Sequence, residues 1–263
     1  MFVIDDGSTD DTKCVVESFI PRFSEKGYIL EYVYQDNQGQ SVAINNGIKR
    51  VHGDYLVWPD ADDFYKTNDA IEILVDALND AGDGVASARC LPEYINEYDL
   101  RVESSISPNQ VFNEYLFEDC LYNNDDFWFC SGGYVVRFNI FKKMFPCLNI
   151  YTEKNAGQNW QLLLPIFFNY RCITVQKVMY SVLKRGSSHS RGQYATRLQI
   201  NEKYRSYRNT IVETLKLMPD IPVKQKKYYI KTIKKKYRKL ILINDIRPIV
   251  HRIKFIIKTI KLK

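Results

Sequence analysis

The first 80 residues alternate between short apolar runs and segments in which apolar residues recur every three or four positions. Short apolar runs are typical of β-strands, and the three- or four-residue spacing is typical of amphipathic helices. Strands that alternate with helices form a sheet covered by helices, so we predict an α/β fold with a mostly parallel sheet. The expected strands are 2–4, 29–34 and 55–58, and the expected helices are 15–20, 41–51 and 68–81.

The C-terminal segment has a different pattern, in which isoleucines at helical spacing alternate with Lys and Arg. Two apolar stripes, at 230–241 and 246–260, predict basic amphipathic helices. We expect the second helix to begin at Asn244 or Asp245, with Pro248 in its first turn, because Asn and Asp are favoured helix caps.

Charge separates this segment from the rest of the chain. Of 37 Lys and Arg residues, 15 lie in 224–263 beside a single acid, which leaves 22 basic and 30 acidic residues elsewhere. Prolines at 219 and 222 mark a boundary, so we predict one domain at 1–218 and a basic tail at 219–263.

Two interpretations of the basic tail remain open. A basic amphipathic helix is attracted to an anionic membrane surface, and each cation contributes about 1 kcal/mol. Alternatively, the apolar stripe packs on the acidic body and the basic face is merely solvated. Nucleic acid is not expected as a partner, because the sequence has no recognition motif for it.

Composition and cysteine spacing exclude several classes of protein. With 263 residues, 45% hydrophobic and 26% charged, the chain is globular rather than disordered, collagen-like or disulfide-stapled. Six cysteines occur singly, without the CxxC spacing of zinc or redox sites, so we expect buried, reduced thiols. No apolar run of about 18 residues and no secretion signal occur. We therefore expect a cytoplasmic protein, peripheral at the inner face of the cell membrane.

Carboxylates follow two of the expected strands, and they are the main candidates for chemistry. Asp5 and Asp6 end the first strand, and Asp60 and Asp62 follow the third. Ligands of α/β sheets collect at such strand ends. Side chains one residue apart on an extended segment point the same way, and two carboxylates make a weak site for Mg²⁺ or Mn²⁺ that phosphate oxygens and water complete. The alternative is a solvated acidic turn.

Three motifs carry a resemblance to a known family. In order, they are VIDDGSTD at 3–10, QDNQGQSVAINNGI at 35–48 and GDYLVWPDADD at 53–63. This series resembles the family-2 nucleotide-sugar glycosyltransferases of the GT-A fold. Weaker signals resemble the second half of the bacterial polysaccharide members: Gly132-Gly133, Arg137, 157–161, Arg185 and 188–191. The resemblance implies a nucleotide-sugar half at about 1–90 and an acceptor half at about 91–218.

The resemblance also implies an activity. It is a metal-dependent, inverting transfer of a sugar from a nucleotide diphosphate donor, expected to be a UDP-sugar, to a hydroxyl of a saccharide or lipid-linked saccharide in cell-surface polysaccharide (capsule) synthesis. Asp62, with Asp60, would hold Mn²⁺ or Mg²⁺. His189 and Arg191 would assist the leaving diphosphate. The implied donor-binding residues are Asp5, Asp6, Gly7, Ser8, Asn37, Gly39, Asn45, Asp60, Ala61, Asp62 and Trp160. Trp160 has an alternative place in the core, and His189 an alternative structural role.

The sequence departs from the family pattern where a general base is expected. An inverting transferase deprotonates the acceptor hydroxyl, and the family carries an acidic pair before the tryptophan for that purpose. Here Gln158 and Asn159 stand in its place, and an amide cannot act as a base. Glu153, Asp125 and Asp126 remain candidates.

A second departure lies at the N-terminus, where the family has a strand before the first acidic motif and this chain has only Met1 and Phe2. We expect a chain truncated at its N-terminus, with that first strand missing. The alternative functions are therefore a catalytically inactive GT-A remnant and a membrane-surface adaptor. A dinucleotide-binding oxidoreductase is disfavoured, because no GxGxxG turn follows the first strand.

Overall fold

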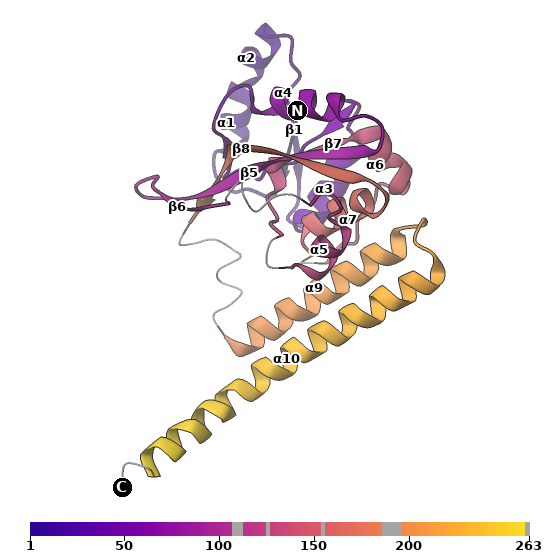
Figure 1. Cartoon of the computed structure of the whole chain (residues 1–263). Coiled ribbons are helices and arrows are strands. Elements are labelled where there is room, and N and C mark those ends of the chain that lie inside the picture. Colours follow the sequence, from indigo (N-terminus) through magenta and orange to yellow (C-terminus); the bar gives the residue numbers. More distant parts are fainter. Residues whose placement is uncertain (107–112, 125–126, 154–155, 186–195, 261–263) are drawn as a thin grey trace.

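The computed structural model shows a sheet covered by helices, from which a long helical hairpin extends (Figure 1). It describes residues 1–106, 113–124, 127–153, 156–185 and 196–260, with side chains described up to 246 in the last segment.

The N-terminal part is a small parallel sheet. Strands β1 (Phe2–Asp6) and β2 (Glu31–Gln35) pair with Asp6 opposite Gln35. The connection contains α1 (Thr12–Ser18) and α2 (Ile20–Glu25), where one helix was predicted. The second helix starts anew because Pro21, at its first turn, has no N–H to continue the preceding helix. Helix α3 (Gln40–Ile48) then packs on β1.

A six-stranded sheet forms the larger layer. Its order is β3-β7-β5-β8-β4, with β6 on β5, and these strands are β3 (Tyr55–Leu56), β4 (Phe64–Tyr65), β5 (Val85–Asn96), β6 (Val102–Ser105), β7 (Tyr134–Arg137) and β8 (Arg171–Lys184). The α/β class is confirmed, but this sheet is mixed rather than mostly parallel. Among its described strand pairs, β5 with β8 is parallel and the other four are antiparallel. Strand β6 follows β5 through a short turn, and such a turn joins antiparallel neighbours.

Helices cover both faces of this sheet. Along β7, Tyr134 and Val136 belong to one apolar cluster and Val135 to the other, as the alternation of a strand requires. Helix α4 (Ala70–Asp80) covers one face. The main core lies on the other, under α5 (Phe117–Tyr122), α6 (Phe138–Met144), α7 (Gln158–Asn169) and α9 (Arg197–Leu217).

Helix α10 (Val223–Ile260) runs antiparallel to α9 and continues past its first residues (Figure 1). The prediction that a separate helix begins at Asn244 or Asp245 is wrong, because both residues lie inside α10. Their side chains bond α9 instead of capping a helix: Asn244 donates to the Arg197 carbonyl, and Asp245 accepts from Asn201.

Two further expectations concern thiols and membranes. The cysteines are free, and four are buried as predicted, whereas Cys14 and Cys147 are exposed. Within the described residues, no helix combines the length and the apolar character needed to cross a membrane.

Candidate functional site

The first acidic strand end is closed by hydrogen bonds from the loop after β2. The Oδ1 atom of Asp6 accepts from the Gln38 backbone N–H at 2.8 Å and from Gln35 Nε2 at 2.7 Å. Its Oδ2 atom accepts from the Gly39 backbone N–H at 2.8 Å. Asp6 therefore joins the end of β1 to the start of α3.

Asp5 and Gly7 fix the turn that carries Asp6. Asp5 accepts from the Ser8 N–H at 2.8 Å and from the Tyr32 hydroxyl at 2.5 Å. Burial alone would raise the pKa of Asp5, but hydrogen bonds from Tyr32, Ser8 and Gly7 together outweigh it and lower that pKa. Gly7 has φ +88°, and a Cβ there would lie 2.8 Å from the backbone nitrogen of Asn37. Only glycine fits so close an approach.

The second acidic strand end is held by side chains from three distant elements. Asp60 Oδ2 accepts from Ser131 Oγ at 2.7 Å, and its Oδ1 accepts from Gln158 Nε2 at 3.0 Å and Gln40 Nε2 at 3.4 Å. Ser131 opens the 3₁₀ turn η2 (Ser131–Gly133), Gln158 opens α7 and Gln40 opens α3. Burial raises the pKa of Asp60, although the bonds from Ser131 and Gln158 oppose that rise.

Asp62 and Asp63 fasten the same turn to the end of β8. Asp62 pairs with the Arg185 guanidinium at 2.5 Å, directly after β8. Asp63 accepts from the Leu183 backbone N–H at 3.0 Å. Burial raises the pKa of Asp63 to about 6. Ala61 is exposed between Asp60 and Asp62.

The two acidic turns meet at the start of α3. Asp6 bonds the backbone of Gly39, and Asp60 bonds the side chain of the next residue, Gln40. The sequence predicted that both acidic clusters lie at strand ends, and the structure brings them to neighbouring residues of one helix start. The resulting site combines carboxylates, backbone N–H donors and one guanidinium.

Sequence reasoning did not identify Ser131 or Gln40 and gave Arg185 no role. Ser131 owes its place to Gly132, where a Cβ would lie 2.3 Å from the ring of Tyr180. The absence of a side chain lets η2 approach β8 closely. The Gly132-Gly133 pair was the only signal for Ser131, since nothing in a lone serine or glutamine indicates its partner.

Two of the predicted donor-binding residues have structural partners. The buried side chain of Asn45 donates to the Ile150 carbonyl at 3.0 Å and accepts from the Ile150 N–H at 2.7 Å, which ties α3 to the segment before α7. Trp160 is only 6% exposed and donates to the Cys120 carbonyl at 2.8 Å. Of the two places expected for Trp160, the structure shows the core rather than a donor-binding position, because the indole packs against Phe129 and Tyr207.

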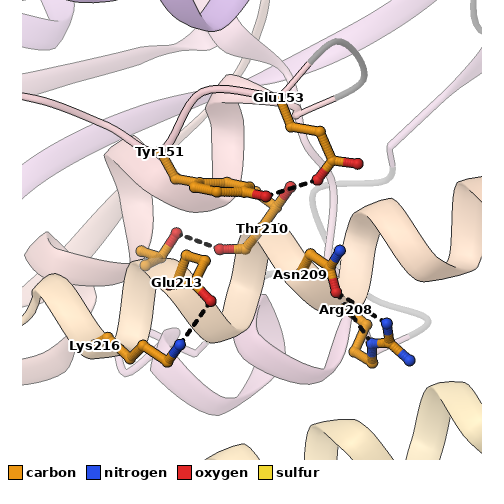
Figure 2. A network of polar contacts seen from close by, with 8 residues as sticks. Tyr151, Glu153, Arg208, Asn209, Thr210, Glu213 and Lys216 are labelled. Atoms are coloured by element: carbon orange, nitrogen blue, oxygen red, sulfur yellow. Dashed lines mark hydrogen bonds and ion pairs between the residues drawn. The ribbon is translucent and has the colours of Figure 1, made fainter.

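Glu153, a candidate base, lies in a polar network beside α9 (Figure 2). Its Oε2 atom accepts from the Tyr151 hydroxyl at 2.9 Å. Burial, and then the bond to Glu153, raise the pKa of Tyr151. No described contact joins Glu153 to Asp60. Gln158, five positions after Glu153, is the residue that bonds Asp60. The other residues predicted for catalysis lie outside the described residues: Asp125, Asp126, His189 and Arg191.

The donor set limits what metal the site fits. Among the described residues, no three His, Cys, Asp or Glu side chains gather as a metal centre. Asp60 and Asp62 offer two carboxylates, and a hard cation held through a diphosphate needs only one or two from the protein. The residues therefore fit Mn²⁺ or Mg²⁺ that arrives with a diphosphate, on the condition that Asp62 leaves Arg185.

Comparisons with known proteins identify the fold and the family. S. aureus TarS residues 1–349, solved in complex with UDP-GlcNAc, aligns with a TM-score of 0.58 and 16% identity over 88% of this chain and 61% of that chain. This likeness confirms the GT-A type of α/β fold. Residues 1–145 match the profile of glycosyl transferase family 2. The chain belongs to glycosyl transferase family 2, as the motifs predicted, and its enzyme class is that of the glycosyltransferases.

Curated relatives agree, although the chain matches only part of them. An uncharacterised glycosyltransferase of Rickettsia conorii is 28% identical over 149 residues, which cover 48% of this chain and 24% of that protein. An uncharacterised glycosyltransferase of Nostoc is 26% identical over 145 residues, or 55% of this chain and 43% of that protein. The chain thus spans about a quarter of the first relative and under half of the second.

Proposed function

We propose that this chain transfers a sugar from a nucleoside diphosphate donor to an acceptor hydroxyl, and that the donor binds where the two acidic turns meet. One observation carries the proposal: Asp6 and Asp60, from different strands, bond the adjacent residues Gly39 and Gln40. A donor joins a base, a ribose, a diphosphate and a sugar, so it needs polar groups from several segments at one place. The UDP-GlcNAc bound by the TarS structure supports a UDP-sugar as the donor.

Each turn receives a separate role in this proposal. The turn that Asp6 closes forms the wall for the base, and Asp60 faces the ribose or the donor sugar. Asp62, with Asp60, holds Mn²⁺ or Mg²⁺, which when bound neutralises charge on the departing diphosphate. Arg185 loses its carboxylate partner when Asp62 takes the cation, and diphosphate oxygens are then the acceptors best suited to its guanidinium.

The chemical step follows from the inverting class. The acceptor hydroxyl oxygen forms a bond to the anomeric carbon while the bond from that carbon to the diphosphate oxygen breaks. The hydroxyl proton passes to a carboxylate base, for which Glu153, Asp125 and Asp126 remain the candidates. A saccharide or lipid-linked saccharide of a cell-surface polysaccharide is the acceptor we propose.

A second candidate function is a donor-binding remnant without turnover. It is favoured by Gln158, which occupies the place of an acidic residue and donates its amide to Asp60. An amide at this position adds no charge and accepts no proton. Such a chain would bind the donor and leave the sugar in place.

A thermal-shift titration tests the donor site. The chain and Asp62→Ala are titrated with UDP, GDP, CDP and NAD, each with and without Mn²⁺. Saturation with one nucleotide at about 100 times its Kd stabilises the folded state by about 2.7 kcal/mol, or roughly 6 °C. We expect that shift with UDP and Mn²⁺ and its loss in Asp62→Ala. A cooperatively melting chain that no nucleotide shifts would contradict the proposal.

Turnover distinguishes the enzyme from the remnant. UDP release from UDP-GlcNAc and other UDP-sugars is measured with and without saccharide acceptors. Release that depends on the acceptor supports transfer. A Mn²⁺-dependent shift without any release supports the remnant instead.

A further inference from the structure

Helix α10 has two contrasting faces. Tyr229, Ile233 and Tyr237 follow one another at four-residue steps and are buried in the main core. The ring of Tyr229 lies 5.3 Å from that of Phe117 in α5. At about 100° per residue, positions such as Lys224 and Lys231 fall on the opposite side of the helix, and both are exposed.

The exposed face is mostly basic over residues 223–239, where seven cations are exposed beside Val223, Gln225 and Tyr228. None of its seven cations forms an ion pair with another described residue. Asp245 is the only acid in the sequence from 224 to 263. Its carboxylate bonds Asn201 at 2.8 Å and lies 3.8 Å from Arg197, and both of these residues are in α9. The charge of this face is therefore not neutralised within the described chain. The seven are Lys224, Lys227, Lys231, Lys234, Lys235, Arg238 and Lys239.

Exposed aliphatic side chains follow the cations along the helix. Leu242, Ile243 and Ile246 are 56%, 51% and 42% exposed, although they are large and apolar. In the sequence, the spacing of 242 and 246 continues through isoleucines at 249, 253, 256 and 260. Residues 242–246 lie beside the first residues of α9, and α10 then continues past them, away from the sheet (Figure 1).

We propose that this exposed surface, residues 224–246 of α10, docks on an anionic phospholipid bilayer. The cations meet lipid phosphates, and the aliphatic side chains enter the boundary between headgroups and acyl chains. The six lysines suit this place, because a long stem reaches apolar depth while its ammonium stays at the surface. The helix would lie on the membrane rather than cross it. This inference goes beyond the donor site and does not depend on it.

Charge and shape favour lipid over the two other possible occupants. A second copy would bring a second row of unpaired cations, whereas paired helices need opposite charges beside their seam. Nucleic acid would satisfy the cations but would leave Leu242, Ile243 and Ile246 exposed, because single strands bind proteins by stacking on aromatic rings. A bilayer satisfies both groups.

Co-sedimentation of the full chain with vesicles tests the proposal. We expect binding to phosphatidylcholine vesicles that contain phosphatidylglycerol, and at least tenfold weaker binding to phosphatidylcholine alone. Each cation near such a surface corresponds to about a fivefold change in affinity. The triple variant Lys227→Glu, Lys231→Glu, Lys234→Glu should therefore bind at least about a hundredfold more weakly.

A matched control separates a local effect from net charge. Lys26→Glu, Lys49→Glu and Arg50→Glu remove the same charge from exposed positions of the body. We expect less than a threefold loss for this control. An equal loss in both variants, or equal binding to vesicles without phosphatidylglycerol, would overturn the proposal.

The aliphatic residues are tested by a second variant. Leu242→Ser with Ile246→Ser should weaken binding at least tenfold and make the remaining binding more sensitive to salt. No change in this variant would leave a purely electrostatic surface and overturn the docking that we propose. Tighter binding to a single-stranded oligonucleotide than to the anionic vesicles at the same salt, or self-association in light scattering that the lysine variant abolishes, would overturn it too.

Discussion

The two acidic strand ends both carry neighbouring aspartates, but the carboxylates are held in different ways. Asp6 is held largely by backbone N–H groups, those of Gln38 and Gly39. Among the described contacts, the carboxylates of Asp60 and Asp62 accept only from side chains, among them Ser131 and Arg185, while the neighbouring Asp63 accepts from the Leu183 backbone N–H. Backbone donors cannot leave unless the loop rearranges, whereas side chains can rotate away.

This difference indicates which end can exchange its partners for a ligand. Asp6 belongs to the frame that positions the start of α3. Asp62 has one described partner, a partly exposed arginine, and such a pair contributes little to stability. Carboxylates that can change partners at low cost are suited to a cation and a diphosphate.

The largest expected effect separates the two ends by stability. Asp6→Ala leaves two backbone N–H groups and the Gln35 amide without their charged acceptor, so we expect the free energy of unfolding to fall by about 2 to 3 kcal/mol. Asp62→Ala, the matched variant at the other end, should change it by less than about 0.5 kcal/mol. Urea denaturation followed by circular dichroism measures both. Equal losses in the two variants would contradict the distinction between frame and site.

The turn around Asp6 could be predicted from the sequence better than the surroundings of Asp60 and Asp62, because it depends on local patterns. The Asp-Asp-Gly turn, the helix at 41–51 and the strand before Pro59 follow from local patterns of apolar residues, glycine and proline. The partners of Asp6 in that turn lie at most 33 positions away. The α/β class and the family could therefore be predicted from such motifs alone.

The partners of Asp60 come from places that no local pattern connects. Ser131 lies 71 positions away and Gln158 lies 98 positions away. Trp160 was open to two interpretations because its spacing in α7 fits a core position as well as a binding position. The packing of α7 against α5 decides between these two interpretations, because the Trp160 indole donates to the Cys120 carbonyl of α5.

A smaller effect is expected for the side chains that hold Asp60. Ser131→Ala removes the hydroxyl that opposes the raised pKa of Asp60, so that pKa should rise further. We expect donor affinity to fall about tenfold at pH 8, the equivalent of one charged hydrogen bond. The loss should grow as the pH is lowered, because a larger share of the variant then carries a protonated Asp60. Isothermal titration with UDP and Mn²⁺ measures it, with Ser104→Ala on exposed β6 as the control. A loss that does not depend on pH would argue against the assigned role.

The smallest effect concerns Asp5, the other acid of the first strand end. Tyr32→Phe removes the hydroxyl that Asp5 accepts from, and we expect a loss of about 1 kcal/mol of unfolding free energy at neutral pH. Tyr34→Phe is the matched control on the same strand, since Tyr34 is exposed. Chemical denaturation across a range of pH measures both variants.

The loss of stability in Tyr32→Phe should depend on pH, with a defined sign at low pH and at high pH. The folded pKa of Asp5 is lowered, so its contribution is present above its unfolded pKa and disappears as the pH falls through the folded value. The pKa of Tyr32 is raised to about 12 by its bond to Asp5, so its contribution is present below an unfolded pKa of about 10 and disappears as the pH rises toward 12. The difference between the chain and Tyr32→Phe should therefore be greatest from about pH 5 to 9 and shrink on both sides. A difference that stays constant from pH 3 to 11 would mean that the two side chains do not share a proton-dependent bond.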